Sequence, residues 1–158
     1  MRRAVLETRE RSSDALPVRA LCEDLCAGLA SKDYLSEYLA IYHCVLGRCR
    51  YMRDPRTIEL VRKPAIIASE IMAGRVPSVD CDDEATFIAA CIEAVGGTAR
   101  IVTCAFRDMF YDGRRQYSHV FVEAFEPKTR EWIVLDPVAA ERTKKMLRDI
   151  KAAKIWEI

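Results

Sequence analysis

The sequence lacks a long apolar segment and a strong excess of charge of either sign. Its longest apolar runs fall far short of the roughly 20 residues that a membrane-spanning helix needs. The opening residues, MRRAVLETRERSSDALP, contain no apolar core of a secretory signal. A formal net charge of +1 does not favour a dedicated nucleic-acid or membrane binder. We therefore expect no membrane partner, no nucleic-acid partner and no export.

Internal repeats, linkers and low-complexity segments are also missing, so the length of 158 residues favours one domain over residues 1–158. An apolar fraction of 51% is ample for a core, and 31% charged residues cover an ordinary surface. Residues 1–12 are charged and aperiodic, which predicts a mobile arm. The predicted core covers about residues 14–137, and a basic helix follows at about 139–153.

The seven cysteines include no CxxC pair, and the chain has only two histidines. This pattern argues against a zinc site, and we expect no metal and no cofactor. An odd number of cysteines without an export signal fits reduced thiols in the cytoplasm better than a disulfide framework. Five of them lie in apolar patterns and are interpreted as small buried hydrophobes: Cys22, Cys26, Cys44, Cys91 and Cys104.

The apolar residues recur first at helical and then at alternating spacing. Helical spacing predicts three helices before residue 80 and a fourth that begins at Cys81 and ends near Gly96. Alternation predicts strands over 100–106, 118–126 and 131–136, with 154–158 as a short edge strand. Helices first and strands later is the α+β pattern, with the fourth helix packed on an antiparallel sheet.

The stretch Val79–Glu84 places a cysteine at the start of a strongly periodic helix. Asp80 is suited to cap this helix, and the acids after Cys81 lie where the helix dipole favours negative charge. Unpaired amides at a helix N-terminus lower the pKa of a thiol. The neighbouring acids oppose this effect, so a cationic partner is required, and His119 is the candidate.

The predicted hairpin around residues 127–130 supplies that partner with a carboxylate. If Glu126 faces Glu131, Asp136 becomes the diagonal neighbour of His119 on the same sheet face. Packing the start of the Cys81 helix against that face would assemble a Cys-His-Asp triad. Cys81 is then the nucleophile, His119 its base and Asp136 the group that orients the imidazole. A slip of one residue in the register would separate Asp136 from His119.

Four segments within about Tyr51 to Pro137 carry a resemblance to a known family: DCDDEATFIAACIEAVGG, IVTCAF, SHVFVEAF and WIVLDP. Together they resemble the transglutaminase-like superfamily of papain-like thiol enzymes, especially its compact bacterial and phage-encoded members. The resemblance implies acyl transfer at amide bonds of a protein or peptide, through a thioester. It assigns the nucleophile, base and acid to Cys81, His119 and Asp136. Val79 stands where these members often have glycine.

Further site residues are predicted from their position along the chain. The amide of Cys81 is a natural oxyanion donor, and Tyr51, on the extended segment upstream, is the candidate for a second. The loop 107–117 precedes His119 and is longer than a usual hairpin connection, which favours a substrate-binding role. Its candidate contacts are aromatic and basic side chains: Tyr111, Arg114, Arg115 and Tyr117.

Two alternatives to a thiol enzyme remain open. The chain could be a catalytically silent binding or assembly module, such as a phage-related structural component. A metal-bound regulatory protein is the second alternative, and Asp82 and Asp83 are the residues that suggest it, although helix-start electrostatics also explain them. The sequence does not separate proteolysis, deamidation and transamidation, and it does not specify the oligomeric state.

Overall fold

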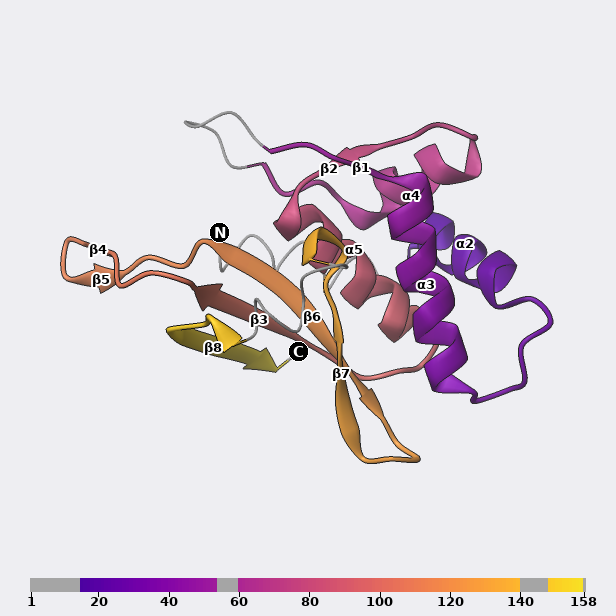
Figure 1. Cartoon of the computed structure of the whole chain (residues 1–158). Helices are drawn as coiled ribbons and strands as arrows, with labels where there is room; N and C mark the ends of the chain where they lie inside the picture. The colour runs from indigo at the N-terminus through magenta and orange to yellow at the C-terminus, as the bar shows by residue number, and fades with distance from the viewer. Residues whose placement is uncertain (1–14, 54–59, 140–147, 158) are drawn as a thin grey trace.

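The fold places helices on one face of an antiparallel sheet (Figure 1). A computed structural model describes residues 15–53, 60–139 and 148–157 of the chain. Within these residues, three helices precede the helix that begins at Cys81, as predicted. The four helices are α2 (Leu16–Cys26), α3 (Tyr34–Arg48), α4 (Pro64–Met72) and α5 (Cys81–Ala94).

Local sequence explains where these helices begin and end. A proline in the first turn starts α2 and α4, where its missing N–H costs nothing. Asp33 is the N-cap residue of α3, and its carboxylate accepts a hydrogen bond from the Ser36 hydroxyl. Glycines with positive φ follow α4 and α5, at Gly74 and Gly96, where a side chain would be strained. The predicted start of the fourth helix at Cys81 is confirmed, and its end near Gly96 is correct to within two residues.

The main sheet has the strand order β7-β6-β3-β8, and every neighbouring pair is antiparallel. In the β6–β7 hairpin Glu126 pairs with Glu131, so the predicted register is confirmed. Helix α5 packs on β6 and β3. The strands are β3 (Ala99–Ala105), β6 (His119–Glu126), β7 (Glu131–Leu135) and β8 (Ala152–Glu157).

The main core lies between the helices and one face of this sheet. On β6, the side chains of Val120, Val122 and Ala124 face the helices. Alternation puts Phe121 on the opposite face, where it forms a smaller cluster with Val102 and Cys104. None of the helices in the described part of the chain is long and apolar enough to cross a membrane.

A short parallel pair ties the segment after α3 to the segment before α5. Strand β1 (Arg50–Tyr51) pairs with β2 (Ser78–Val79), and α4 lies between them along the chain. The amide of Met52 donates to the carbonyl of Val79 over 2.8 Å, which extends the pairing by one bond. Tyr51 is thereby fixed beside the residues that lead into Cys81.

Two parts of the fold differ from the prediction. The segment 107–117 is not a featureless loop, because β4 (Phe110–Tyr111) and β5 (Arg114–Arg115) form a hairpin. Asp112 and Gly113 both have positive φ, as a tight two-residue hairpin turn requires.

The predicted helix 139–153 is wrong at its C-terminal end. Residues 140–147 and the predicted arm 1–12 lie outside the described residues. Pro137–Ala139 forms the 3-10 helix η1, whereas Ala152 and Ala153 already belong to β8. The edge strand predicted from residue 154 therefore exists and starts two residues earlier. Strand β8 pairs with β3, so the sheet core extends beyond residue 137.

Candidate active site

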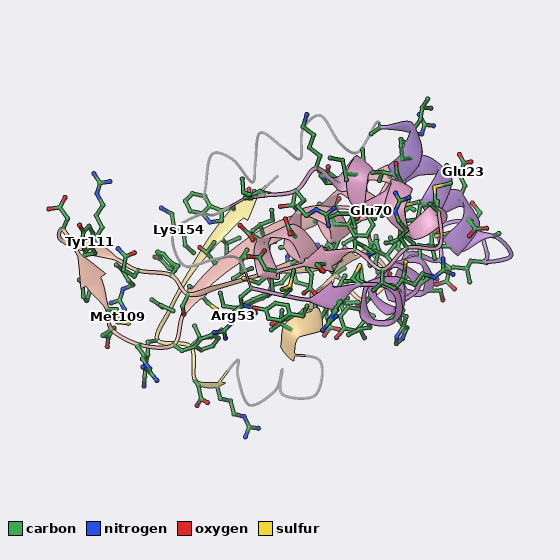
Figure 2. All side chains as sticks on the ribbon, turned by 90° about the horizontal axis from the view of Figure 1, so that it is seen from above. Glu23, Arg53, Glu70, Met109, Tyr111 and Lys154 are labelled. Atoms are coloured by element: carbon green, nitrogen blue, oxygen red, sulfur yellow. The ribbon has the colours of Figure 1, made fainter. Side chains whose placement is uncertain are left out.

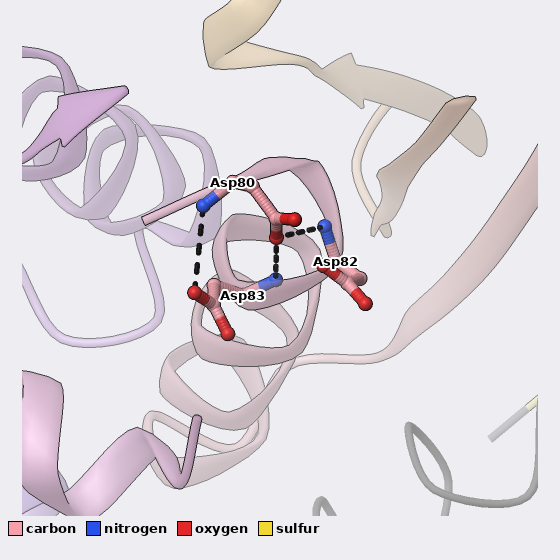
Figure 3. A group of neighbouring side chains, drawn as sticks. All are labelled: Asp80, Asp82 and Asp83. Carbon is pink, nitrogen blue, oxygen red and sulfur yellow. Dashed lines mark hydrogen bonds between the residues drawn. The ribbon is translucent and has the colours of Figure 1, made fainter. Parts of the chain in front are cut away.

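Helix α5 begins with a complete capping box, which the sequence predicted in part (Figure 3). The carboxylate of Asp80 accepts from the amides of Asp82 and Asp83, both over 3.3 Å. The Asp83 carboxylate in turn accepts from the amide of Asp80 over 3.4 Å. These bonds satisfy amides that a helix start would otherwise leave without partners. The backbone that carries Cys81 is therefore held rigidly.

The acids that follow Cys81 are buried, which the sequence did not predict. Asp82, Asp83 and Glu84 are each no more than 5% exposed. Burial is the main cause that raises their pKa values, to about 8, about 6 and about 8 respectively. Near neutral pH much of the negative charge expected in this first turn is therefore replaced by bound protons.

Three of these carboxylates also lie close to one another. Asp80, Asp82 and Asp83 each offer an oxygen within 4.8 Å of the others. Helix capping accounts for the positions of Asp80 and Asp83, since both accept hydrogen bonds from backbone amides. The grouping alone therefore does not identify a metal site.

The Cys81 thiol lies between α5 and the sheet, near the backbone of Val120. Burial raises its pKa to about 12, and the carboxylates of Asp80 and Asp82 add to the shift, while the Val120 amide opposes it. This is the opposite direction from the one expected for a thiol at a helix N-terminus. The cause is that burial and two acids outweigh the few amides that face the sulfur.

His119 and Asp136 are joined as predicted. The distance from His119 Nε2 to Asp136 Oδ2 is 2.8 Å, and both side chains are buried. Because a carboxylate only accepts, Nε2 donates to Asp136, and in a neutral imidazole Nδ1 then keeps its lone pair. The rings of Phe106 and Phe121 also lie near the imidazole, and each ring centroid is 6.1 Å from that of the imidazole. Its orientation is thus determined by a hydrogen bond and by two aromatic side chains.

Cys81, the third member of the predicted triad, lies near His119 but makes no hydrogen bond to it in the described residues. Cys81 approaches the backbone of Val120, the residue after His119. Within the described residues, no hydrogen bond joins the Cys81 sulfur to the His119 ring. The helix covers the face of β6 that Val120 presents, whereas His119 contacts Phe121 on the other side. In the described residues, the Cys81 sulfur and the His119 ring are therefore not directly hydrogen-bonded to each other.

Tyr51 lies near Cys81 at the start of α5. The β1–β2 pairing brings it next to Val79, and it is 40% exposed. Burial raises the pKa of its hydroxyl, and the nearby Cys81 and Asp80 contribute in the same direction. The structure thus brings Tyr51 together with Cys81.

The candidate substrate residues of the loop are not brought to Cys81. The β4–β5 hairpin projects beyond the end of the sheet and away from α5, and Tyr111 lies at its far end (Figures 1 and 2). The Arg115 guanidinium group forms an ion pair with Asp108, and its Cζ lies 4.8 Å from the centroid of the Phe110 ring. Arg115 is therefore engaged by neighbours within its own segment. Arg114 is exposed, and half-buried Tyr117 lies two residues before His119.

Two residues near the site escaped the sequence interpretation. The Tyr42 hydroxyl donates to the backbone carbonyl of Asp136 over 3.3 Å, which ties α3 to the end of β7. Glu84 is buried near the Asp136 carboxylate, which contributes to the rise in the pKa of Glu84. The only local signal for Glu84 was an acid one helical turn after the cysteine.

Comparison with known proteins agrees with this architecture. The chain matches none of the curated proteins. A "putative protease" from Parabacteroides distasonis shares the fold with a TM-score of 0.60 and 10% identity, over 86% of this chain and 26% of that one. A "putative cysteine protease" from Cytophaga hutchinsonii has a TM-score of 0.53 and 16% identity, over 98% of this chain and 51% of that one. This chain therefore spans about a quarter and about half of their respective lengths.

The family model of the transglutaminase-like superfamily matches residues 19–137. This range includes Cys81, His119 and Asp136, and it covers more than half of the chain. The chain belongs to the transglutaminase-like superfamily.

Proposed function

We propose that this protein is a cysteine-dependent enzyme that transfers acyl groups at amide bonds of a protein or peptide substrate. The observation that carries the proposal is the 2.8 Å bond between His119 Nε2 and Asp136 Oδ2, close to the start of the helix that bears Cys81. An imidazole held by a buried carboxylate is an oriented general base. The seven free thiols suit a reducing compartment, and we propose the cytoplasm.

In the proposed reaction, His119 Nδ1 takes the proton from the Cys81 sulfur after a side-chain rotation. The sulfur attacks the carbonyl carbon, and the electron pair of the C=O bond moves to its oxygen. The C–N bond then breaks, the amine leaves with the proton from His119, and a thioester remains on Cys81. Water or a second amine attacks the thioester and restores the thiol, which gives hydrolysis or transamidation.

Two donors are proposed for the negative oxygen that forms in this attack. The amide of Cys81 lies at the first turn of α5, where the helix leaves it without an intrahelical acceptor. The hydroxyl of Tyr51, close to the cysteine, is the proposed second donor.

The raised pKa of Cys81 determines how the enzyme would work. Burial and the nearby acids raise this pKa, which favours a neutral thiol in the resting protein at neutral pH. The nucleophile is then generated by His119 during the reaction, as in general-base catalysis, rather than stored as an ion pair.

The test is the alkylation of individual cysteines by iodoacetamide, with mass spectrometry reporting each site. Because the pKa values of Cys26, Cys49 and Cys81 are all raised, preferential modification of Cys81 near neutral pH requires help from a base. We expect Cys81 to react faster than partly exposed Cys26, and His119→Ala to remove this preference. Asp136→Asn should weaken it without abolishing it.

Equal reaction of Cys81 and Cys26 in the natural protein would overturn the proposal. It would favour the silent binding or assembly module, for which the neutral thiol and the missing Cys81–His119 hydrogen bond are the supporting observations. A peptide-substrate screen with a mass readout, with Cys81→Ala as the control, would then identify the reaction type. Turnover by the Cys81→Ala protein would exclude the mechanism.

A further inference from the structure

Glu84 is a buried acid next to the proposed catalytic pair, and helix capping does not explain it. It lies in the first turn of α5 but makes none of the capping bonds, which belong to Asp80 and Asp83. Its side chain is 5% exposed, and Oε2 is fully buried without a hydrogen-bond partner. A polar atom buried in this way destabilises the fold, so a purely structural position would be better filled by an apolar residue.

The groups around Glu84 are mostly acids or neutral hydroxyl and thiol groups. Asp136 approaches it from the end of β7, Tyr42 and Cys49 from α3 and its C-cap, and Asp80 and Asp83 from its own helix. Arg62 lies at the same end of α5, but its guanidinium group binds Glu70 and the carbonyl of Ser78. No cation of the described residues forms an ion pair with Glu84. A second negative charge here would therefore act directly on Asp136.

We propose that Glu84 is a positioning residue for the His119–Asp136 pair: its neutral carboxyl group keeps a second negative charge away from Asp136, and loss of its proton displaces Asp136 from His119. The protein carries the cost of a buried acid, and the acid makes the catalytic pair sensitive to alkaline pH. Burial and the nearby Asp136 raise the pKa of Glu84 to about 8, which agrees with a neutral side chain at neutral pH. This role rests on the proposed function of His119 and Asp136.

The His119–Asp136 bond can be observed directly, because the chain has only two histidines. In protein labelled with ¹⁵N-histidine, the Nε2–H proton of His119 should give a downfield NMR signal while it donates to Asp136. His43→Gln, on the exposed side of α3, assigns the two sets of signals. We expect the His119 signal to persist below pH of about 8 and to disappear above it.

Neutral replacements should remove this pH limit. Glu84→Gln preserves the shape of the side chain, and Glu84→Met is neutral without hydrogen-bonding groups. Both variants should keep the signal up to pH of about 9, where the proton concentration is about tenfold lower than at the limit of the natural protein. Glu126→Gln is the matched control, since Glu126 is also buried with an unpartnered Oε2 but lies at the other end of β6. It should behave like the natural protein.

The outcomes separate this inference from the proposed function. Loss of the His119 signal at the same pH in all four proteins would reflect exchange with solvent and overturn the role of Glu84. The role of Glu84 would also be overturned if Glu126→Gln were the only variant that kept the His119 signal to a higher pH. If the NMR results are as expected but Cys81 shows no preferential alkylation, the enzymatic proposal fails while the coupling of Glu84 to His119 and Asp136 stands.

Discussion

Cys81 is surrounded by acids rather than by cations, and this decides how its reactivity can be changed. Asp80 has two separable roles, because it caps α5 and also raises the pKa of the thiol through its charge. Asparagine is nearly as good an N-cap as aspartate but carries no charge. The two roles can therefore be separated by one substitution.

We predict that Asp80→Asn increases the rate of Cys81 alkylation about three- to tenfold at mildly alkaline pH, because removal of the charge lowers the pKa of the thiol. The free energy of unfolding should change by less than about 0.5 kcal/mol, since the cap is retained. Asp80→Ala is the control, which should also react faster but lose about 1 kcal/mol of stability. An unchanged alkylation rate in Asp80→Asn would show that the carboxylate does not act on the sulfur.

Tyr51 offers a second test at the scale of one atom. If its hydroxyl donates to the oxyanion, Tyr51→Phe should lower kcat by about 10²-fold with little change in KM, because the interaction forms only in the transition state. The ring and the β1–β2 pairing are preserved in this variant, so its thermal stability should match that of the natural protein. A rise in KM with unchanged kcat would instead assign Tyr51 to substrate binding.

At the scale of secondary structure, sequence periodicity correctly predicted the helices and strands that bury one apolar face in the core. The capping signal and apolar stripe located α5, and hairpin geometry gave the register that joins His119 to Asp136. On α3, Leu35, Leu39 and Leu46 also recur at helical spacing in the sequence, yet they are 39–40% exposed. The helix is rotated so that Tyr38, Ile41 and Val45 are central, because neighbours on two sides select its buried face.

Residue type and spacing predicted only part of the candidate site. Cys81, His119 and Asp136 stand at element ends, where a register or a cap fixes them. The burial of Glu84 and the bond from Tyr42 depend on how α3 and α5 meet, and no local pattern encodes this. The predicted direction of the Cys81 pKa shift was wrong for the same reason, because the shift depends on burial of the thiol against the sheet.

The position of the β4–β5 hairpin allows its predicted role in substrate binding to be tested with substrates of different size. It starts beside His119, where the Ser118 amide binds the Cys104 carbonyl, but its tip projects away from α5. We predict that Arg114→Ala together with Arg115→Ala raises KM severalfold for an acidic unfolded protein and leaves KM for a short peptide unchanged. High salt should remove the difference. Equal effects on both substrates would indicate a structural role for the hairpin.

For the whole molecule, the buried acids of α5 make stability depend on pH. Asp82, Asp83 and Glu84 have raised pKa values in the fold, so between about pH 4 and about pH 8 the folded protein binds more protons than the unfolded chain. Their contribution to stability is present below this range and is lost as pH rises through it. We predict that the free energy of unfolding in urea is lower at about pH 9 than at about pH 5 by at least about 1 kcal/mol. Glu84→Gln should reduce this difference, and an unchanged pH dependence would contradict the account.

Because β8 pairs with β3, the sheet can be completed only late in synthesis of the chain. A ribosome adds roughly 5–20 residues per second, so the helix with Cys81 leaves it first, then the β6–β7 hairpin with His119 and Asp136, and last the strand that completes the sheet. Until β8 has emerged, β3 keeps one edge without a partner, and the sheet that holds the histidine is incomplete. We therefore predict that preferential reaction of Cys81 requires translation of residues 152–157. A nascent chain stalled before this strand should carry a Cys81 that does not yet react preferentially with iodoacetamide, and preferential reaction in the stalled chain would contradict this prediction.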